Sequence, residues 1–453
     1  MANPSLSEYL AQSQRGLYQS VFGPEYLHKE GLGAGTVFQS GNSDIFQTTY
    51  GRKVWQALNN QTRFFNAIPR VVWGNTAGWR VRSDRGSGRS RPVTEVGSLP
   101  TVDVSAIQTI SSLPRIVSTT FGASVKSVFT AQLEGGVGDV LALENENAQL
   151  DHIKEINEEL NAGSAYIVND GVESATQCRV PAAVAKHFKI GDAVSRNDGG
   201  TMDVTSGSVI SAANTTNGNL TMATVTAEGN WADGDIVQIF SRAGFTSIQD
   251  VVAEDGMGVG GATNGANVKA YDIDLASRTA GGWNAGASVQ YNSGVGRDLT
   301  LTHLDTAIQK IRENGGEPKL ILLGHDQYFK LERLLNSQQR YMGQEEYQVG
   351  IGSEKTYPGT RTGLVLSTYM GIPILPDADV AKSVSSADAV LGTDVFVLDT
   401  DYIEMAIAQP TQYVENRDYF AANALVVRGL LYTMGEMRVK NIWTQAKISD
   451  LNS

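Results

Sequence analysis

The sequence predicts an α+β fold in which a long hairpin and a long helix accompany a mixed α/β core. Three stretches carry this prediction. Residues 70–99 place alternating Val and Trp around a tip rich in Gly, Ser and Arg, which is typical of a hairpin. Residues 140–160 repeat apolar side chains at helical spacing, and residues 299–398 alternate helical periodicity with short apolar strands.

The hairpin expected between Arg70 and Leu99 is the most informative of these stretches. The residues expected to form its strands and turn are Val71, Trp73, Trp79, Val81, Val93 and Val96, with the turn at Ser83–Gly88. The tip carries almost no apolar side chains, so it cannot pack on its own body. Because a two-stranded ribbon alone is marginal in water, we expect another copy of the chain to stabilise it.

The amino-acid composition excludes or disfavours several classes of protein. The chain has 453 residues, 41% of them hydrophobic, and a net charge of −12, which disfavours a sequence-independent nucleic-acid binder. Its single cysteine, Cys178, excludes an internal disulfide framework and predicts a buried structural thiol. No apolar run approaches the roughly 20 residues of a membrane span, and the N-terminus lacks the pattern of a signal peptide, so we expect no membrane partner.

The order of elements follows from local patterns. Up to about Thr62 the chain is polar and Gly-rich, which predicts an extended arm with one short helix capped at Ser5. A glycine hinge at 135–138 precedes a helix expected from Asp139 to Gly163, with one apolar and one acidic face. Residues 175–245 change to short strands around an Asn217-Gly218 turn, which predicts an inserted small β-barrel or sandwich.

The insertion also repeats a phrase, Phe188–Val194 and Trp231–Val237, in which Gly-Asp precedes an apolar pair. Elsewhere no catalytic pattern is complete. Gly256–Gly261 matches a dinucleotide fingerprint by letter but continues into loop composition, so we expect a linker. His152 and Glu155 resemble half of a carboxylate-bridged metal site, yet the second half is missing, and a solvated acidic face is the favoured interpretation. We therefore expect no cofactor, no metal and no enzymatic activity.

Arginines gather on the hairpin, and carboxylates gather on the long helix. The candidate inter-subunit contact residues are Arg80, Arg82, Arg85, Arg89, Arg91, Trp73 and Trp79 on the hairpin, with Glu144, Glu146, Asp151 and Glu158 on the helix. Arg pairs bidentately with carboxylates, which favours contact between subunits. Simple solvation and contact with nucleic acid are the alternative interpretations.

This order of elements resembles the major capsid proteins of tailed double-stranded DNA viruses, which have the Hong Kong 97-type fold. The resemblance is strongest over the expected helix 301–312, strand 320–323 and helix 326–335, then over Met370–Pro376 (MGIPILP) and Val395–Asp399 (VFVLD). It implies seven segments: an N-terminal arm (1–62), an E-loop hairpin (63–115), a peripheral domain with the spine helix (116–174), the inserted β domain (175–245), a connector with further peripheral domain (246–298), an axial domain (299–410) and C-terminal strands that return to the core (411–453).

The resemblance also implies a function. Copies would form pentamers and hexamers that close into an icosahedral shell around the genome, assembled in the host cytoplasm. A portal, a scaffolding protein and a decoration protein would be further partners, with packaged DNA met only by non-specific proximity. Some relatives cross-link a hairpin Lys to a neighbour's Asn, but this chain has no lysine between Lys53 and Lys126. The alternatives are an encapsulin-like nanocompartment shell, and a carbohydrate-binding or carbohydrate-active protein with a β-module.

Overall fold

The structure is a computed structural model that describes most residues from 62 to 453. The described residues are 62–74, 78–82, 90, 92–95, 97–100, 102, 104–105, 107–131, 140–163, 165–168, 173–198, 201–202, 208–224, 230–253, 269–271, 273–274, 287–336, 343–348, 356–361, 368–384, 390–417 and 425–453. The predictions for the arm, the turn at Ser83–Gly88, the hinge at 135–138 and the linker at Gly256–Gly261 lie outside the described residues.

The chain divides into two compact units. One comprises Met1–Leu58, Phe121–Asn147 and Glu415–Gly429, and the other comprises Asn59–Thr120, Ala148–Val414 and Leu430–Ser453. Their boundaries fall inside β4 (Arg115–Ser124), α6 (Val140–Asn161), β23 (Ile403–Asn416) and β24 (Val426–Val439).

In the first unit, β4 and β24 approach each other at two glycines. A Cβ atom at Gly429 would lie 2.3 Å from the ring of Phe121, and one at Gly122 would lie 3.1 Å from the carbonyl oxygen of Val427. The short helix α5 (Val125–Ala131) begins where the backbone N–H of Val125 donates to the carbonyl of Leu425 at 3.0 Å. A side chain at position 429 would therefore push the Phe121 ring away.

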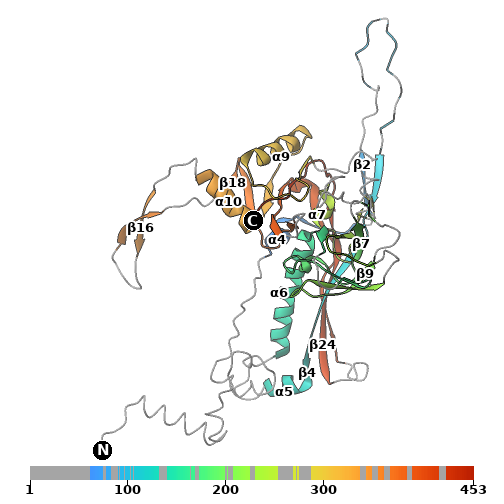
Figure 1. The fold of residues 1–453 in the computed structure, drawn as a ribbon, viewed down its shortest axis with the longest axis vertical. Coiled ribbons are helices and arrows are strands. Elements are labelled where there is room, and N and C mark those ends of the chain that lie inside the picture. The colour runs from blue at the N-terminus through green and yellow to red at the C-terminus, as the bar shows by residue number, and fades with distance from the viewer. Residues whose placement is uncertain are drawn as a thin grey trace, which may run out of the picture. The chain divides into compact units, whose positions relative to one another are not determined.

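In the second unit, a six-stranded sheet carries the expected alternation of helices and strands (Figure 1). Its order is β14 (Ser288–Gln290), β25 (Ala446–Ile448), β22 (Val395–Leu398), β15 (Leu320–Leu323), β19 (Ile372–Pro376) and β18 (Thr368–Tyr369). Alternate side chains of β15 and β22 enter different cores, as period-two geometry requires. Ile321 and Val397 pack with α9 (Leu301–Glu313) and α10 (His325–Asn336), which confirms the helices and strands predicted there.

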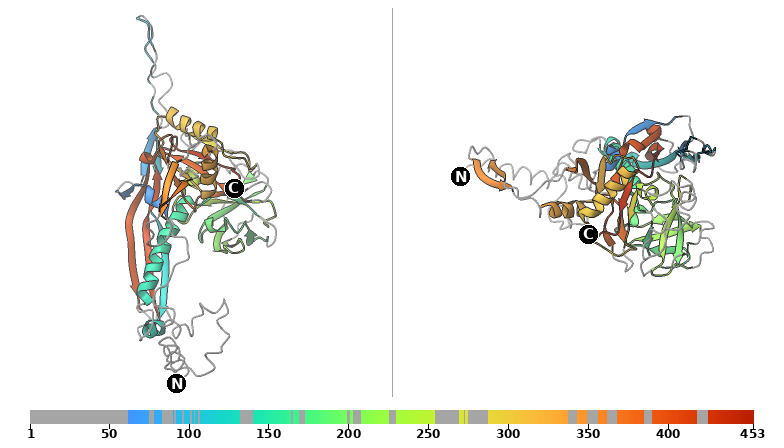
Figure 2. Two further views of the ribbon diagram at one scale, coloured as in Figure 1. Left: turned by 90° about the vertical axis from the view of Figure 1, so that its left-hand side faces the viewer. Right: turned by 90° about the horizontal axis from the view of Figure 1, so that it is seen from above.

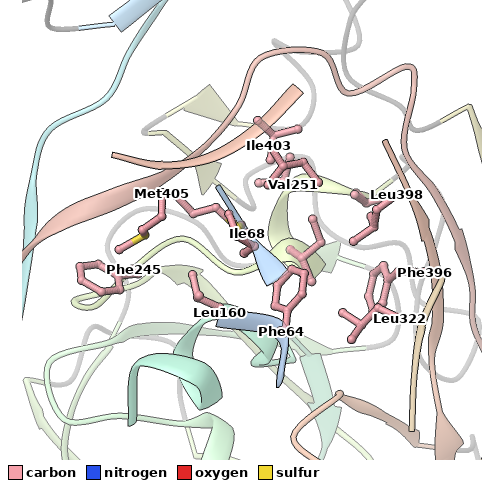
Figure 3. Packing of buried hydrophobic residues seen from close by; sticks show 14 of the residues in the cluster. Phe64, Ile68, Leu160, Phe245, Val251, Leu322, Phe396, Leu398, Ile403 and Met405 are labelled. Atoms are coloured by element: carbon pink, nitrogen blue, oxygen red, sulfur yellow. The ribbon is translucent and has the colours of Figure 1, made fainter. Parts of the chain in front are cut away.

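The other face of this sheet meets the main core (Figure 3). Leu322 and Phe396 pack there with Phe64 of α4 (Arg63–Ala67) and Leu160 of α6. The backbone N–H of Phe64 donates to Asp377 at 2.9 Å. Residues 63–67 thus form a helix that the buried Phe64 side chain anchors in the body.

The inserted segment folds as a seven-stranded sheet with its own core, drawn in green in Figure 2. Its strands are β5 (Ala165–Ile167), β6 (Gln177–Arg179), β7 (Ala193–Asp198), β8 (Thr201–Met202), β9 (Ser208–Ala213), β10 (Asn219–Thr224) and β11 (Ile236–Ser241). The two ends of the strand order, β5 and β6, place Tyr166 and Cys178 in the same core, so the sheet curls on itself. The predicted Asn217-Gly218 turn joins β9 to β10, and Cys178 is buried as expected.

The repeated phrase of the insertion builds the same turn twice. Gly191 and Gly234 have φ angles of +95° and +85°, in the region that favours glycine. The following carboxylates accept backbone N–H groups three residues earlier, Asp192 from Lys189 at 3.0 Å and Asp235 from Ala232 at 2.6 Å. Each turn starts a strand, and the two strands, β7 and β11, pair antiparallel.

The long helix is confirmed as α6, and its acidic face is partly buried. His152 is 1% exposed, with Nδ1 3.0 Å from the Thr119 hydroxyl and Nε2 2.7 Å from the Thr433 hydroxyl. Burial lowers the pKa of His152. The prediction of a solvated face is therefore wrong at His152, because the ring fills the space between α6 and two strands. Among the described residues no group of His, Cys, Asp and Glu is arranged to hold a metal ion.

The remaining elements are short. They are β1 (Arg70–Val72), β2 (Gly78–Arg82), β3 (Ile107–Ser111), η1 (Ala185–His187), α7 (Ile248–Val251), β12 (Lys269–Ala270), β13 (Ile273–Asp274), β16 (Gly343–Gln348), β17 (Thr356–Arg361), β20 (Lys382–Val384), β21 (Val390–Thr393) and η3 (Thr400–Tyr402). No helix among the described residues is long and apolar enough to span a membrane.

Candidate assembly surface

The predicted hairpin is present, but it is longer than expected. β2 pairs antiparallel with β3, from Gly78 opposite Ser111 to Arg82 opposite Ile107. The prediction that the chain returns through Val93 and Val96 is wrong. Pro92 and Pro100 flank that stretch, and a turn closes within it where the Gly97 N–H donates to the Thr94 carbonyl. The strand forms instead at residues 107–111, where Ile110 is buried and Ile107 is exposed on the opposite face.

The sequence analysis places Val71 in the first strand of the hairpin. In the structure, Val71 lies in β1, which belongs to the body. Its residues Arg70–Val72 pair in parallel with Met405–Ile407 of β23. Trp73 follows, donating its backbone N–H to the Ile407 carbonyl at 2.8 Å. The guanidinium of Arg438 lies 3.9 Å from the centre of the Trp73 ring, a cation–π distance.

The base of the β2–β3 ribbon is also packed on its own chain. Trp79 meets the ring of Tyr271 edge-on, with centroids 5.0 Å apart, and Ile110 is 1% exposed. Both tryptophans of the candidate set therefore pack within their own subunit, and Trp79 anchors the ribbon there, which the sequence pattern did not reveal.

The stretch from Leu99 to Leu113, which contains β3, carries large apolar side chains that are more than half exposed. Val102 is 100% exposed, Val104 82%, Leu99 80%, Leu113 62% and Ile107 61%. Single exposed apolar residues are ordinary, but several of them within one short stretch of chain mark an interaction site. We call residues Leu99, Val102, Val104, Ile107 and Leu113 the apolar row.

The candidate charges fall into different settings. Arg80 and Arg82 are exposed on β2, and Arg85, Arg89 and Arg91 lie outside the described residues. On α6, Glu146 and Asp151 are exposed and Glu144 is half-buried. Glu158 instead pairs with Lys189 of its own chain at 3.3 Å, beside a Glu155–Lys189 pair at 2.8 Å.

A buried charged cluster, which the sequence did not predict, lies where the insertion leaves α6. Arg242 forms a buried pair with Asp250 and donates to the Gly163 carbonyl at 2.7 Å. Asp192 accepts the Ala243 N–H at 2.9 Å. Arg242 thus ties both ends of the insertion to α7, a role that no local spacing indicates.

Glu159 completes this charged cluster. It is 4% exposed, and no hydrogen-bond partner for its Oε2 atom is found in the part of the chain that the structure describes. Burial raises the pKa of Glu159 to about 8; the Asp192 charge adds to the rise, and Arg242 opposes it. Glu159 is therefore largely protonated at neutral pH.

The described residues of this region offer contact surfaces. Comparison with known proteins agrees with this interpretation. The sequence model of the family described as SU10 major capsid protein matches residues 32–451. No curated protein matches the chain.

A solved capsid structure with a TM-score above 0.5 shows the fold. A chain of the cyanophage A-1(L) capsid asymmetric unit is similar with a TM-score of 0.53 at 11% identity, covering 89% of this chain and 97% of that chain. The capsid of an empty GTA particle has a TM-score of 0.45 at 12% identity, covering 93% and 98%. A structure from Mycobacterium phage Ogopogo has 0.42 at 10% identity, covering 87% and 94%.

Proposed function

Since the chain belongs to the SU10 major capsid protein family and has the Hong Kong 97-type capsid fold, we propose that its copies form the pentamers and hexamers of an icosahedral shell. The protein is a structural, shell-forming component of the virion capsid. The shell encloses a viral double-stranded DNA genome, is assembled in the host cytoplasm and works without enzymatic activity. A portal and a scaffolding protein, with a decoration protein on the outside, complete the list of proposed partners.

The observation that carries this proposal is the apolar row. Burying one large aliphatic side chain is worth about 1.5–3 kcal/mol, and five such residues stand exposed in one segment. Within one subunit this exposure stabilises nothing. A neighbouring copy that lies under the ribbon removes the row from water and holds a segment whose tip is marginal alone.

The charges support the same arrangement. Arg80 and Arg82 are exposed on the ribbon, while Glu146 and Asp151 are exposed carboxylates on α6. We assign these as complementary contacts between copies, together with Arg85, Arg89 and Arg91. Each exposed pair is worth about 0.2–1 kcal/mol, so the pairs set orientation more than strength.

A double substitution tests the role of the apolar row. Val102→Asp with Val104→Asp places charges where the neighbour should lie, and the yield of shells or capsomers should fall at least tenfold while the melting temperature of the subunit is unchanged. The matched control is Ile190→Asp with Val295→Asp, two residues that are 69% and 56% exposed on other elements. Equal assembly by both double variants would overturn the assignment of this surface.

A further inference from the structure

Two legs join the β2–β3 ribbon to the body. The first leg runs from β1 through Trp73 into β2, and the second runs from β3 through residues 112–114 into β4. The ribbon is a two-stranded sheet, so no third strand of that sheet orients it. Its direction therefore depends on what holds the chain at Trp73 and at the start of β4.

Strand β24 holds both legs, at residues that are two apart. The guanidinium of Arg438 lies 3.9 Å from the centre of the Trp73 ring, on the first leg. The carboxylate of Glu436 pairs with Arg115, the first residue of β4, with Nε and Oε2 3.2 Å apart. Glu436 is 1% exposed and Arg438 is 7% exposed, so both contacts are shielded from water and are stronger than surface contacts. We call Glu436 and Arg438 the root clamp.

The chain that returns from the insertion contacts both partners of the Glu436–Arg115 pair. The Nη1 atom of Arg115 donates to the carbonyl oxygens of Arg242 at 2.9 Å and Gly244 at 3.0 Å. The backbone N–H of Thr246 donates to Oε1 of Glu436 at 2.7 Å. Residues 242–246 therefore fix the positions of the guanidinium and of the carboxylate together.

A fixed direction favours assembly. A ribbon that is already held loses little conformational freedom when it meets a neighbouring copy, whereas a ribbon that swings must be ordered at that moment. We propose that the root clamp, supported by residues 242–246, positions the ribbon so that its apolar row meets the neighbouring copy. Glu436, Arg438 and Arg115 are positioning residues in this role, because they act through the legs of the ribbon. This inference rests on the proposed assembly of the chain into a shell.

Glu436 makes the clamp dependent on pH. Burial raises the pKa of Glu436 to about 7, and the Arg115 charge and the backbone N–H groups of Thr246 and Met437 oppose the rise. The carboxylate that pairs with Arg115 is therefore lost as the pH falls through 7, so the ribbon is held more loosely at pH 6 than at pH 8. Glu159, in the neighbouring charged cluster, has a pKa of about 8 and also titrates in this range.

Spin labels measure the direction of the ribbon in the full-length subunit before assembly. Labels at Ile107→Cys on β3 and Val295→Cys on the body report their separation, and the native Cys178 is buried. In wild type, the share of a narrow distance component should fall from about nine-tenths at pH 8 to about one-tenth at pH 6, following the ionised fraction of Glu436. Glu436→Gln should give the broad component at both pH values. Glu159 is present in both proteins, so it does not account for that difference.

Glu404→Gln is the matched control. Glu404 lies on the adjacent strand β23 and pairs with Lys440 at 2.6 Å, outside the clamp. This variant should keep the wild-type distributions and the wild-type yield of particles, whereas Glu436→Gln should lower the yield roughly fivefold.

Arg115→Lys is a second test that does not depend on the folding of Glu436→Gln. A lysine keeps the positive charge but cannot bond the carboxylate and both carbonyls at once, so the narrow component at pH 8 should fall to less than about half of the wild-type share. Distributions that superimpose for wild type, Glu436→Gln and Arg115→Lys would overturn the clamp. Broad distributions with an unchanged yield would overturn its role in positioning. If wild type does not assemble, the proposed function fails, and the distance measurement still decides whether the clamp exists.

Discussion

Glu159 shows how one residue couples the insertion to the body. Its carboxyl lies beside Gly244, where an added Cβ would be 2.4 Å from Oε2, so the acid is confined where the chain returns from the insertion. Asp192 and Asp250 bring further negative charge to the same cluster, and Arg242 and Lys189 bring positive charge. A protonated Glu159 keeps this cluster near balance.

The pH dependence of stability follows from this residue. The folded pKa of about 8 exceeds the ordinary value of 4.5, so the fold binds the proton more tightly than the unfolded chain. The free energy of unfolding should therefore fall as pH rises from 4.5 and level off above 8. Glu159→Gln removes this loss, so the variant should gain stability over wild type between pH 5 and pH 8, by roughly 1 kcal/mol or more. Thermal melting at both pH values measures the gain.

Parallel pH profiles of wild type and Glu159→Gln would contradict this account. Glu436, a buried acid with a pKa raised to about 7 by burial, is present in both proteins and so cancels in the comparison.

At the scale of elements, patterns with a strong period predicted structure well. The helix ending before Gly163, the helix at 301–312 and the strands at 320–323 and 395–398 are present because their apolar spacing matches one buried face. The ribbon was harder to predict, because Val93 has a strand-forming side chain but is not part of a strand, and β2 pairs with residues 107–111 instead. Trp79 and Arg242 could not be placed, since their partners Tyr271 and Asp250 are set by tertiary packing.

The boundaries of the insertion lead to a prediction about excision. Replacing 164–241 by a short Gly/Ser linker keeps Arg242 with Asp250 and the Gly163 carbonyl, so a soluble, assembling chain is expected. Replacing 175–245 leaves β5 without β11 and Asp250 without its cation. Loss of one partner of a buried ion pair costs about 3–5 kcal/mol, so that chain should be insoluble. Soluble yield and melting temperature measure the difference, and equal behaviour of both chains would show that Arg242 does not hold the junction.

At the scale of the whole molecule, the residues of the ribbon determine whether copies in the shell can be joined by a covalent cross-link or only by non-covalent contacts. Lysine is absent between Lys53 and Lys126, and the basic residues in that stretch are arginines, whose guanidinium stays protonated and is not an amine nucleophile. Shell stability must then come from burial of surfaces such as the apolar row. Boiled particles on a denaturing gel should give a single band near 48.6 kDa. A ladder of covalent hexamers and pentamers would refute this prediction.

Electron microscopy of the purified full-length protein, expressed alone and with its scaffolding protein, tests the central claim most directly. Closed shells or ring-shaped capsomers are expected, because the apolar row and the ribbon are satisfied only when copies meet. A monodisperse 48.6 kDa species at high protein concentration, in both preparations, would contradict the account.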